Sequence, residues 1–319
     1  MKQRILITGG TGMVGKALTK VLLSKGYAVT ILTRDKKIFD PNQNPAFAHW
    51  DLKRKYIDPQ AIQSADHIIH LAGAGVADKR WTKERKQEIR DSRVQSGELL
   101  VRSLQITPNK VQSVVSASAI GWYGPDPRPG FSGFIESDPP DNGFLGNTCK
   151  EWEGAIEPVS HLGKRLVRIR IGIVLAKEGG AFPEFARSFR FGVKAILGSG
   201  RQIISWVHIN DLVNIFIRAM ETESMTGVYN GVAPNPVSNK EMMRAISKKK
   251  GRFFLPVIVP AFVLKILLGE MSVEVLKSTT VRPKRLLDEE YKFQFATIEE
   301  AVGALATKFK PHVPNETHS

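Results

Sequence analysis

One segment near the amino terminus reads Thr8-Gly9-Gly10-Thr11-Gly12-Met13-Val14-Gly15, and it joins an apolar run to a helical pattern. Gly9 permits a tight turn, Gly12 lets backbone N–H groups approach a pyrophosphate, and Gly15 lets a helix pack close to a strand. The N-terminus of that helix would then face the negative charge. The alternative is an ordinary glycine-rich turn, and the pattern around the segment decides between the two.

Short β-branched runs alternate with longer helical patterns on both sides of this turn. The runs lie at residues 4–8, 28–33, 47–50, 67–71, 111–118 and 166–170, and the helical patterns at 13–25, 82–104 and 147–159. Such alternation implies parallel strands with right-handed crossovers. The sequence therefore predicts an α/β fold, a doubly wound parallel sheet of the Rossmann type.

The pattern loosens after residue 172, and from residue 239 onward it is mostly helical. We expect residues 1–171 to form the dinucleotide-binding Rossmann domain, rejoined by about 203–236, where residues 228–230 return as an edge strand. Residues 172–202 and 237–319 are then a smaller substrate lobe, mostly helical at the C-terminus.

The chain is strongly basic, with 46 lysines and arginines against 31 acidic residues in 319, a net charge of +15. The clusters at residues 248–252 and 282–285 lack the interleaved aromatics of a nucleic-acid stacking platform. The apolar segment 253–269 is too short and interrupted to span a bilayer. We therefore expect no nucleic-acid and no membrane partner, and a basic surface that is simply solvated.

Compartment and metal content follow from cysteine and histidine usage. Cys149 is the single cysteine, so no disulfide is available. The first apolar run is followed by glycines, which indicates a strand rather than a signal peptide. The seven histidines show no ligand spacing. The sequence predicts a cytoplasmic protein without a metal site.

The second strand ends at Thr33 and Arg34, and Arg34 lies 19 positions after Gly15. An NAD site usually places an acidic residue here to accept from the ribose hydroxyls, whereas a guanidinium suits a 2′-phosphate. The position favours NADP over NAD. The alternative is that Arg34 is a solvated charge and Asp35 binds the ribose.

Several further motifs give the chain a family resemblance. They are Trp50-Asp51-Leu52, His70-Leu71-Ala72-Gly73, Ser116-Ala117-Ser118-Ala119 before Tyr123-Gly124, and Trp206-Val207-His208-Ile209-Asn210-Asp211. With the glycine pattern, they resemble the extended short-chain dehydrogenases/reductases. Residues 78–82, 197–202 and 283–287 narrow this to the atypical, nucleoside-diphosphate-sugar-epimerase-like branch, with a small helical C-terminal domain.

The resemblance implies a set of cofactor contacts along the carboxyl edge of the sheet. The set is Gly9, Gly12, Met13, Val14, Gly15, Thr33, Arg34, Asp51, Leu52, Leu71, Ala72, Gly73, Arg80 and Ile173. Asp51 and Leu52 would lie at the adenine, and Ile173 near the nicotinamide. For Asp51 the alternative is a turn residue, and for Ala72 and Gly73 packing alone.

The chain departs from this family at its catalytic helix. Typical members carry a Tyr-x-x-x-Lys pair on one helical face, in which tyrosine is the general acid/base. Here the two positions hold Leu145 and Cys149, and Lys150 is one residue late, about 100° around the helix. Either another residue serves, or the chemistry differs, or the protein binds cofactor without turnover.

Two hydroxyl residues remain as catalytic candidates. Ser118 matches the serine that hydrogen-bonds the substrate oxygen in the family, and Tyr123 is the nearest substitute acid. The alternatives are a strand-end serine that satisfies local backbone groups and a tyrosine that anchors a loop. For Cys149, a buried thiol is favoured over a nucleophile.

The late cluster Trp206, His208 and Asp211 would lie near the substrate cleft and tie the two lobes together. We expect Trp206 and Arg201 to bind substrate, Arg201 by pairing with an anionic group. For Arg201 the alternative is a solvated arginine. A lone histidine in such a place is more often structural than catalytic, and we expect His208 to be structural.

These features predict an NADP(H)-binding oxidoreductase or epimerase-like protein without the usual dyad. It would act on a small, unidentified substrate, which is anionic if it pairs with Arg201. The alternative is a cofactor-binding redox sensor or interaction protein without robust turnover. A homodimer is compatible with either.

Overall fold

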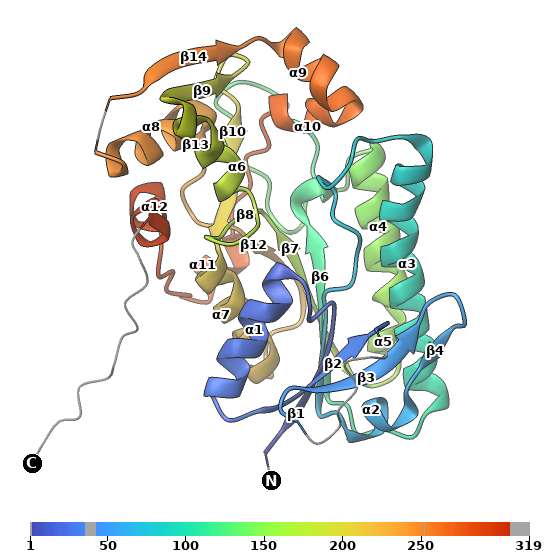
Figure 1. Ribbon diagram of the computed structural model, residues 1–319. Coiled ribbons are helices and arrows are strands. Elements are labelled where there is room, and N and C mark those ends of the chain that lie inside the picture. The colour runs from blue at the N-terminus through green and yellow to red at the C-terminus, as the bar shows by residue number, and fades with distance from the viewer. Residues whose placement is uncertain (1, 36–42, 252, 307–319) are drawn as a thin grey trace, which may run out of the picture.

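The computed structural model describes residues 2–35, 43–251 and 253–306, and its centre is an eight-stranded sheet (Figure 1). The strands are β1 Arg4–Thr8, β2 Ala28–Thr33, β3 Ala46–Asp51, β4 Tyr56–Ile57, β5 His67–His70, β6 Ser113–Ala119, β7 Arg165–Ile171 and β12 Gly227–Gly231. Their order is β12-β7-β6-β5-β1-β2-β3-β4, and all pairs are parallel except β3 with β4. The predicted doubly wound parallel sheet is confirmed, and β12 is the edge strand expected at residues 228–230.

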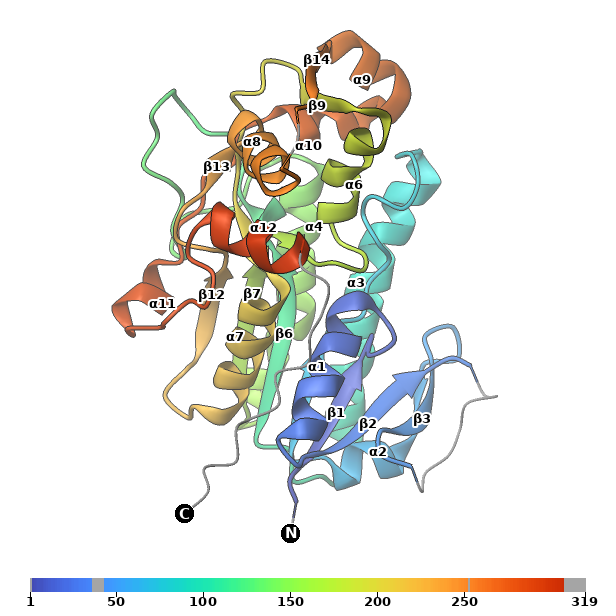
Figure 2. The same cartoon turned by 60° about the vertical axis from the view of Figure 1, so that its left-hand side comes forward.

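Helices cover both faces of this sheet, as Figures 1 and 2 show. The helices α1 Met13–Ser24 and α7 Ile209–Glu221 lie on one face, and α2 Pro59–Ser64, α3 Lys83–Ile106, α4 Phe144–Ile156 and α5 Pro158–His161 lie on the other. Alternate residues of β1 point to the two faces, since Ile5 and Ile7 pack in the core with α1 and α7, and Leu6 in the core with α3. This double burial explains the continuous apolar strands.

A second group of elements stands above the carboxyl edge of the sheet (Figure 2). It contains β8 Ile173–Leu175, α6 Phe182–Arg187, β9 Val193–Leu197, β10 Ile203–Ile204, β11 Trp206–His208, β13 Val237–Ser238, α8 Asn239–Lys249, β14 Leu255–Val259, α9 Ala261–Leu268, α10 Ser272–Leu276 and α12 Ile298–Ala306, while α11 Lys284–Asp288 packs beside β12. Short 3-10 turns are η2 Ile120–Trp122, η3 Ser188–Phe191 and η4 Gly269–Met271. This second group of elements has a hydrophobic core of its own, formed by Phe182, Phe189, Trp206 and the inner faces of α8 and α12.

The helical lobe expected at the C-terminus is present, and one part of it is extended instead. β14 pairs in parallel with β9, from Leu255 beside Val193 to Val259 beside Leu197. Pro256 and three β-branched residues make this segment a poor helix. The predicted helix 147–159 begins earlier, at Phe144, and divides at Pro158 into α4 and α5. Among the described helices, none has the length and apolar character needed to cross a membrane.

Candidate functional site

The glycine turn lies where the strand order reverses, between β1 and its neighbours β5 and β2. Open α/β sheets bind ligands outside the carboxyl ends of their strands at such a switch point. Gly9 has φ +69°, and a Cβ there would lie 2.9 Å from the carbonyl group of Leu71. At Gly15 a Cβ would lie 2.5 Å from the Cα of Gly10. The backbone is therefore packed as closely as glycine allows.

The first turn of α1 leaves its N–H groups available. Gly12 is the N-cap of α1, so no side chain caps the helix, and Met13 and Val14 follow as its first residues. Such an N-terminus attracts anions because its free N–H groups and the helix dipole point the same way. The close-packed glycine turn and the uncapped helix both fit a pyrophosphate.

A buried hydrogen-bond set supports this turn from below. The Thr8 hydroxyl accepts from the N–H groups of Leu71 and Ala72, at 3.1 and 3.2 Å, and hydrogen-bonds His70 Nδ1 at 2.8 Å. Thr8 is then the donor to Nδ1, so Nε2 carries the ring proton toward Ser96 Oγ at 3.4 Å. Burial lowers the pKa of His70 to about 4. A neutral histidine thus holds together the strand ends that form the cradle.

The residues expected at the adenine end lie on neighbouring strands. Arg34 is exposed just after β2, and the buried Thr33 accepts a hydrogen bond from the N–H of Asp35 at 3.1 Å. Asp51 accepts from the N–H groups of Lys53 and Arg54, and these bonds hold the pKa of its carboxyl below the usual value. Asp51 therefore shapes the turn that contains Leu52.

The loop after β5 connects the two lobes. Ala72 is buried and Gly73 is exposed. Arg80 lies against Gly269 of η4, where an added Cβ would be 3.1 Å from Arg80 Nη2. Nearby, Lys86 of α3 forms an ion pair of 2.7 Å with Glu270.

The helix that should carry the dyad is α4, and its side chains are apolar at the two positions. Leu145 is half-buried against Gly121, and Lys150 is exposed. The Cys149 thiol is buried and donates to the Ala119 carbonyl at 3.6 Å, and burial raises the pKa of this thiol to about 12. Cys149 is therefore protonated at neutral pH, as the buried-thiol interpretation predicts.

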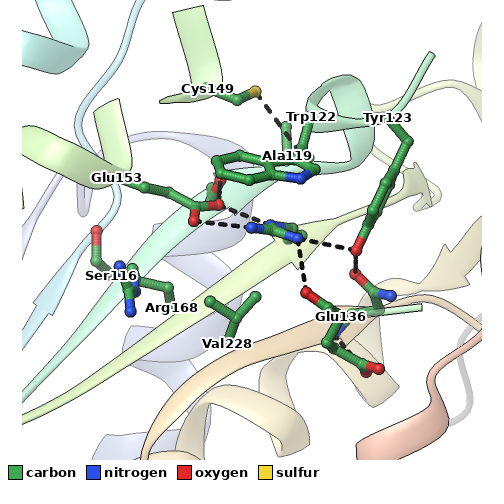
Figure 3. Close-up of polar contacts among 12 residues, drawn as sticks. Ser116, Ala119, Trp122, Tyr123, Glu136, Cys149, Glu153, Arg168 and Val228 are labelled. Atoms are coloured by element: carbon green, nitrogen blue, oxygen red, sulfur yellow. Dashed lines mark hydrogen bonds and ion pairs between the residues drawn. The ribbon is translucent and has the colours of Figure 1, made fainter. Parts of the chain in front are cut away.

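Ser118 belongs to a buried charged network that sequence reasoning did not predict. Figure 3 shows two other members of this network, Glu153 and Tyr123. The Ser118 hydroxyl donates to Glu153 Oε1 at 2.7 Å. Arg170 of β7 donates to both oxygens of Glu153, at 2.8 and 3.0 Å. Both charged side chains are at most 5% exposed. The sequence did hold a sign of buried charge here, since Arg168 and Arg170 alternate with apolar residues in β7.

Tyr123 closes the same network. Its hydroxyl accepts from Arg170 Nη1 at 3.0 Å and lies 2.8 Å from Asn230 Oδ1. Burial raises the pKa of Tyr123 to about 12. The ring of Trp122 lies 3.7 Å from the Arg170 guanidinium. Burial alone would lower the pKa of Arg170, but Glu153 and Tyr123 raise it overall. This geometry favours the loop-anchoring alternative for Tyr123.

A second cation, Arg93 of α3, lies under Gly73 and beside α4. Its guanidinium carbon is 5.0 Å from the Trp152 ring, and a Cβ on Gly73 would be 3.2 Å from it. Burial lowers the pKa of Arg93, while the Cys149 thiol partly offsets this. Within the described residues, no carboxylate lies within 4 Å of it. Sequence reasoning missed Arg93 because only the fold brings α3 against α4.

The late cluster ties the upper elements to the sheet. Trp206 is fully buried, and its Nε1 donates to the Asn235 carbonyl at 3.0 Å. His208 Nδ1 accepts from the N–H of Asn210 and so caps α7, and burial lowers the pKa of His208 to about 4. Asp211 accepts from two N–H groups of the segment before α12. These contacts give His208 a structural role, as expected from the sequence.

Four predicted or newly found residues lie on the segments that follow β7 and β9. Ile173 is 40% exposed beside Trp206, and Arg201 is exposed after the turn that follows β9. Gly179 and Gly180, both with positive φ, lie over α1, where added Cβ atoms would be 3.3 and 3.2 Å from Met13 Sδ. The structure thus brings the residues after β7 against the glycine turn. In the part of the chain that the structure describes, no three potential metal ligands come together.

Comparison with known proteins shows that this chain is similar to epimerase family proteins. The model of the NAD dependent epimerase/dehydratase family matches residues 5–144, and that of a domain of unknown function, DUF1731, matches residues 259–305. The chain is 33% identical over 308 residues to the chloroplastic epimerase family protein SDR39U1 homologue of Arabidopsis thaliana, covering 94% of this chain and 86% of that one. It is also 33% identical over 302 residues to the epimerase family protein YfhF of Bacillus subtilis, covering 94% and 97%.

Solved structures of epimerase family proteins are also similar to this chain. The human epimerase family protein SDR39U1 (isoform 2), crystallised with NADPH, superposes with a TM-score of 0.84 at 30% identity, covering 95% of this chain and 99% of that one. The UDP-N-acetylglucosamine 4-epimerase of Bacillus cereus, at 17% identity and a TM-score of 0.73, shares the fold, with 95% and 98% covered.

Proposed function

The chain belongs to the epimerase family, and we propose that it binds NADP(H) at the β1/β5 switch point and acts on a small substrate held below the upper lobe. The observation that carries the proposal is the glycine turn, in which Gly9 and Gly15 pack against other backbone with no room for a Cβ and the N-terminus of α1 has no side-chain cap. When bound, the nicotinamide would supply or take up a hydride. The protein's own residues would bind, orient and exclude water.

The preference for NADP over NAD rests on Arg34. Its guanidinium is exposed directly after β2, where the cofactor's adenosine ribose meets this kind of sheet. The similar human protein was crystallised with NADPH, which supports the same choice.

The cofactor choice is testable by fluorescence titration. We expect the protein to bind NADPH at least tenfold more tightly than NADH, because a phosphate–guanidinium pair stabilises a complex by about 1.5–3 kcal/mol. Arg34→Ala should remove most of that difference by weakening NADPH binding alone. Lys53→Ala, on the next strand's turn, is the matched control. An unchanged affinity ratio in Arg34→Ala would show that another residue selects the cofactor.

We propose that Arg93 takes the place of the cation that the dyad lysine supplies in relatives. It lies beside Cys149, which stands at the lysine position, and it has no carboxylate partner among the described residues. Arg93 is half-buried, and its Nη1 donates to the Ile89 carbonyl at 2.8 Å. The guanidinium has further N–H groups that suit a ligand's hydroxyl or phosphate oxygens.

Acid/base chemistry is the open part of the site, and we keep Ser118 and Tyr123 as its candidates. The two hydroxyls are joined through Glu153 and Arg170. If one hydroxyl lost its proton, the buried guanidinium would stabilise the oxyanion that remains. The competing proposal is cofactor binding without robust turnover. It is favoured by the hydrogen bond that already occupies the Ser118 hydroxyl.

Hydride exchange separates the two. Labelled NADPH incubated with sugar nucleotides and simple carbonyl compounds should lose label to substrate if the protein turns over. Complete retention of label in a sample that binds NADPH well would support the binding-only function.

A further inference from the structure

Large apolar side chains gather on the outside of the upper lobe. Of the 13 that are exposed in the described residues, eight lie on η3, β14, α9 and the segment before β14. They are Phe191, Phe253, Leu255, Val257, Ile258, Phe262, Ile266 and Leu267. We call them the apolar patch. Figures 1 and 2 place β14 and α9 at the end of the molecule opposite α2.

The helix α9 exposes most of its large apolar side chains, whereas an ordinary surface helix buries them. Leu264 is its one buried side chain, whereas Phe262 and Ile266, a turn apart, are 64% and 67% exposed. A surface helix normally turns its apolar side inward. An outward apolar side that continues onto the neighbouring strand marks an interaction surface.

The same region holds much of the unexplained positive charge. Residues 188–200 and 244–268 carry eight lysines and arginines and no aspartate or glutamate, against a net charge of +15 for the chain. The cations are Arg190, Lys194, Arg244, Lys248, Lys249, Lys250, Arg252 and Lys265. Of those whose side chains the structure describes, none has a carboxylate within 4 Å in the described part of the chain.

A surface cavity lies where the apolar patch meets the cations. It has a volume of about 430 Å³ and is lined by Lys194, Lys248, Ser247, Phe253 and Pro256, among others. Two ammonium groups and a hydroxyl beside a phenylalanine and a proline suit a phosphodiester that is attached to an apolar chain.

We propose that this face binds the surface of an anionic phospholipid bilayer, with the apolar patch at the acyl boundary and the cations at the headgroups. Such binding needs no spanning helix. It departs from the sequence-based expectation of no membrane partner, which considered only a transmembrane segment. A nucleic acid would use the cations but not the exposed apolar side chains. A second copy of the chain, docked through the same face, would bring like charges together.

The test is flotation of the full chain with vesicles of phosphatidylcholine, alone or with roughly one third phosphatidylglycerol. Each lysine or arginine near an anionic surface contributes about 1 kcal/mol, or about fivefold in partitioning. We expect binding to the anionic vesicles to exceed binding to the neutral ones by more than tenfold and to weaken with salt. Lys194→Glu with Lys248→Glu should lower it at least tenfold, and so should Phe262→Ser with Ile266→Ser.

Matched controls lie elsewhere on the surface. Ile106→Ser, at a 70% exposed side chain on α3, and Arg102→Glu, at an exposed arginine of the same helix, should float as the wild type does. Every variant alters an accessible side chain, so thermal unfolding and NADPH affinity should stay unchanged, which separates this proposal from the proposed cofactor site. Failure of the wild type to float with anionic vesicles would overturn it. Equal losses in the controls, or a dimer that Phe262→Ser with Ile266→Ser dissociates while no vesicles bind, would do the same.

Discussion

Arg93 stands beside the helix that lacks the family's lysine, and its role can be separated from a structural one. Arg93→Met should weaken NADPH binding by about tenfold or more, because removal of a charged hydrogen-bond donor costs about 1.5–3 kcal/mol. Arg93→Lys should restore part of the affinity, since an ammonium keeps the charge. Titration with NADPH checks both. Arg102→Met, at an exposed arginine of the same helix, is the control. Equal NADPH affinity in Arg93→Met and the wild type would leave Arg93 as a packing residue.

Tyr123 poses a different residue-level question, because its hydroxyl is fully occupied. Tyr123→Phe would leave Asn230 Oδ1 and one Arg170 N–H without their partner, which costs about 1–3 kcal/mol of unfolding free energy. A loop anchor predicts this loss, measured by urea denaturation, together with unchanged NADPH affinity. A catalytic tyrosine predicts in addition a fall in any turnover of a hundredfold or more. Tyr56→Phe, at an exposed tyrosine, is the control.

At the scale of elements, the ion pair of Glu153 and Arg170 joins α4 to β7, and Ser118 brings in β6. Glu153→Gln should destabilise the fold by about 3–5 kcal/mol, because it leaves a buried guanidinium without its counter-charge. Glu153→Leu with Arg170→Met removes both charges, and we expect it to be clearly more stable than Glu153→Gln. Chemical denaturation of the wild type, Glu153→Gln and the double variant measures their unfolding free energies. A double variant no more stable than Glu153→Gln would contradict the account of a coupled pair.

What the sequence could predict at this scale depends on how local the cause is. The strand β1, the turn at Gly9 and the helix α1 were predictable because β-branched runs, glycine spacing and helical periodicity are all read within 20 residues or so. β14 was not predictable, because its apolar residues face outward and its partner strand β9 lies 62 positions earlier in the chain. The pairing of Arg170 with Glu153 and the place of Arg93 depend on which helix packs on which strand, which one sequence does not state.

At the scale of the whole molecule, acid sensitivity follows from histidines on both lobes. Burial lowers the pKa of His70 and of His208 to about 4 each, against an ordinary 6.5, and lowers that of His67 as well. In each case the unfolded chain takes up a proton at a pH where the native protein does not. Stability is therefore full above about pH 6.5 and is lost as the pH falls toward 4.

The size of the effect can be measured where few other groups titrate. Between pH 6 and 5 the unfolded histidines are mostly protonated, so His70 and His208 together should lower the unfolding free energy by about 2 kcal/mol. The carboxylates with lowered pKa values, Asp51 and Glu300 among them, act below this window. Urea denaturation at several pH values gives the slope. His208→Asn keeps an acceptor for the N–H of Asn210 and should roughly halve that slope, because it removes one of the two strongly shifted rings while the cap of α7 remains. A slope that His208→Asn leaves unchanged would place the titrating group elsewhere.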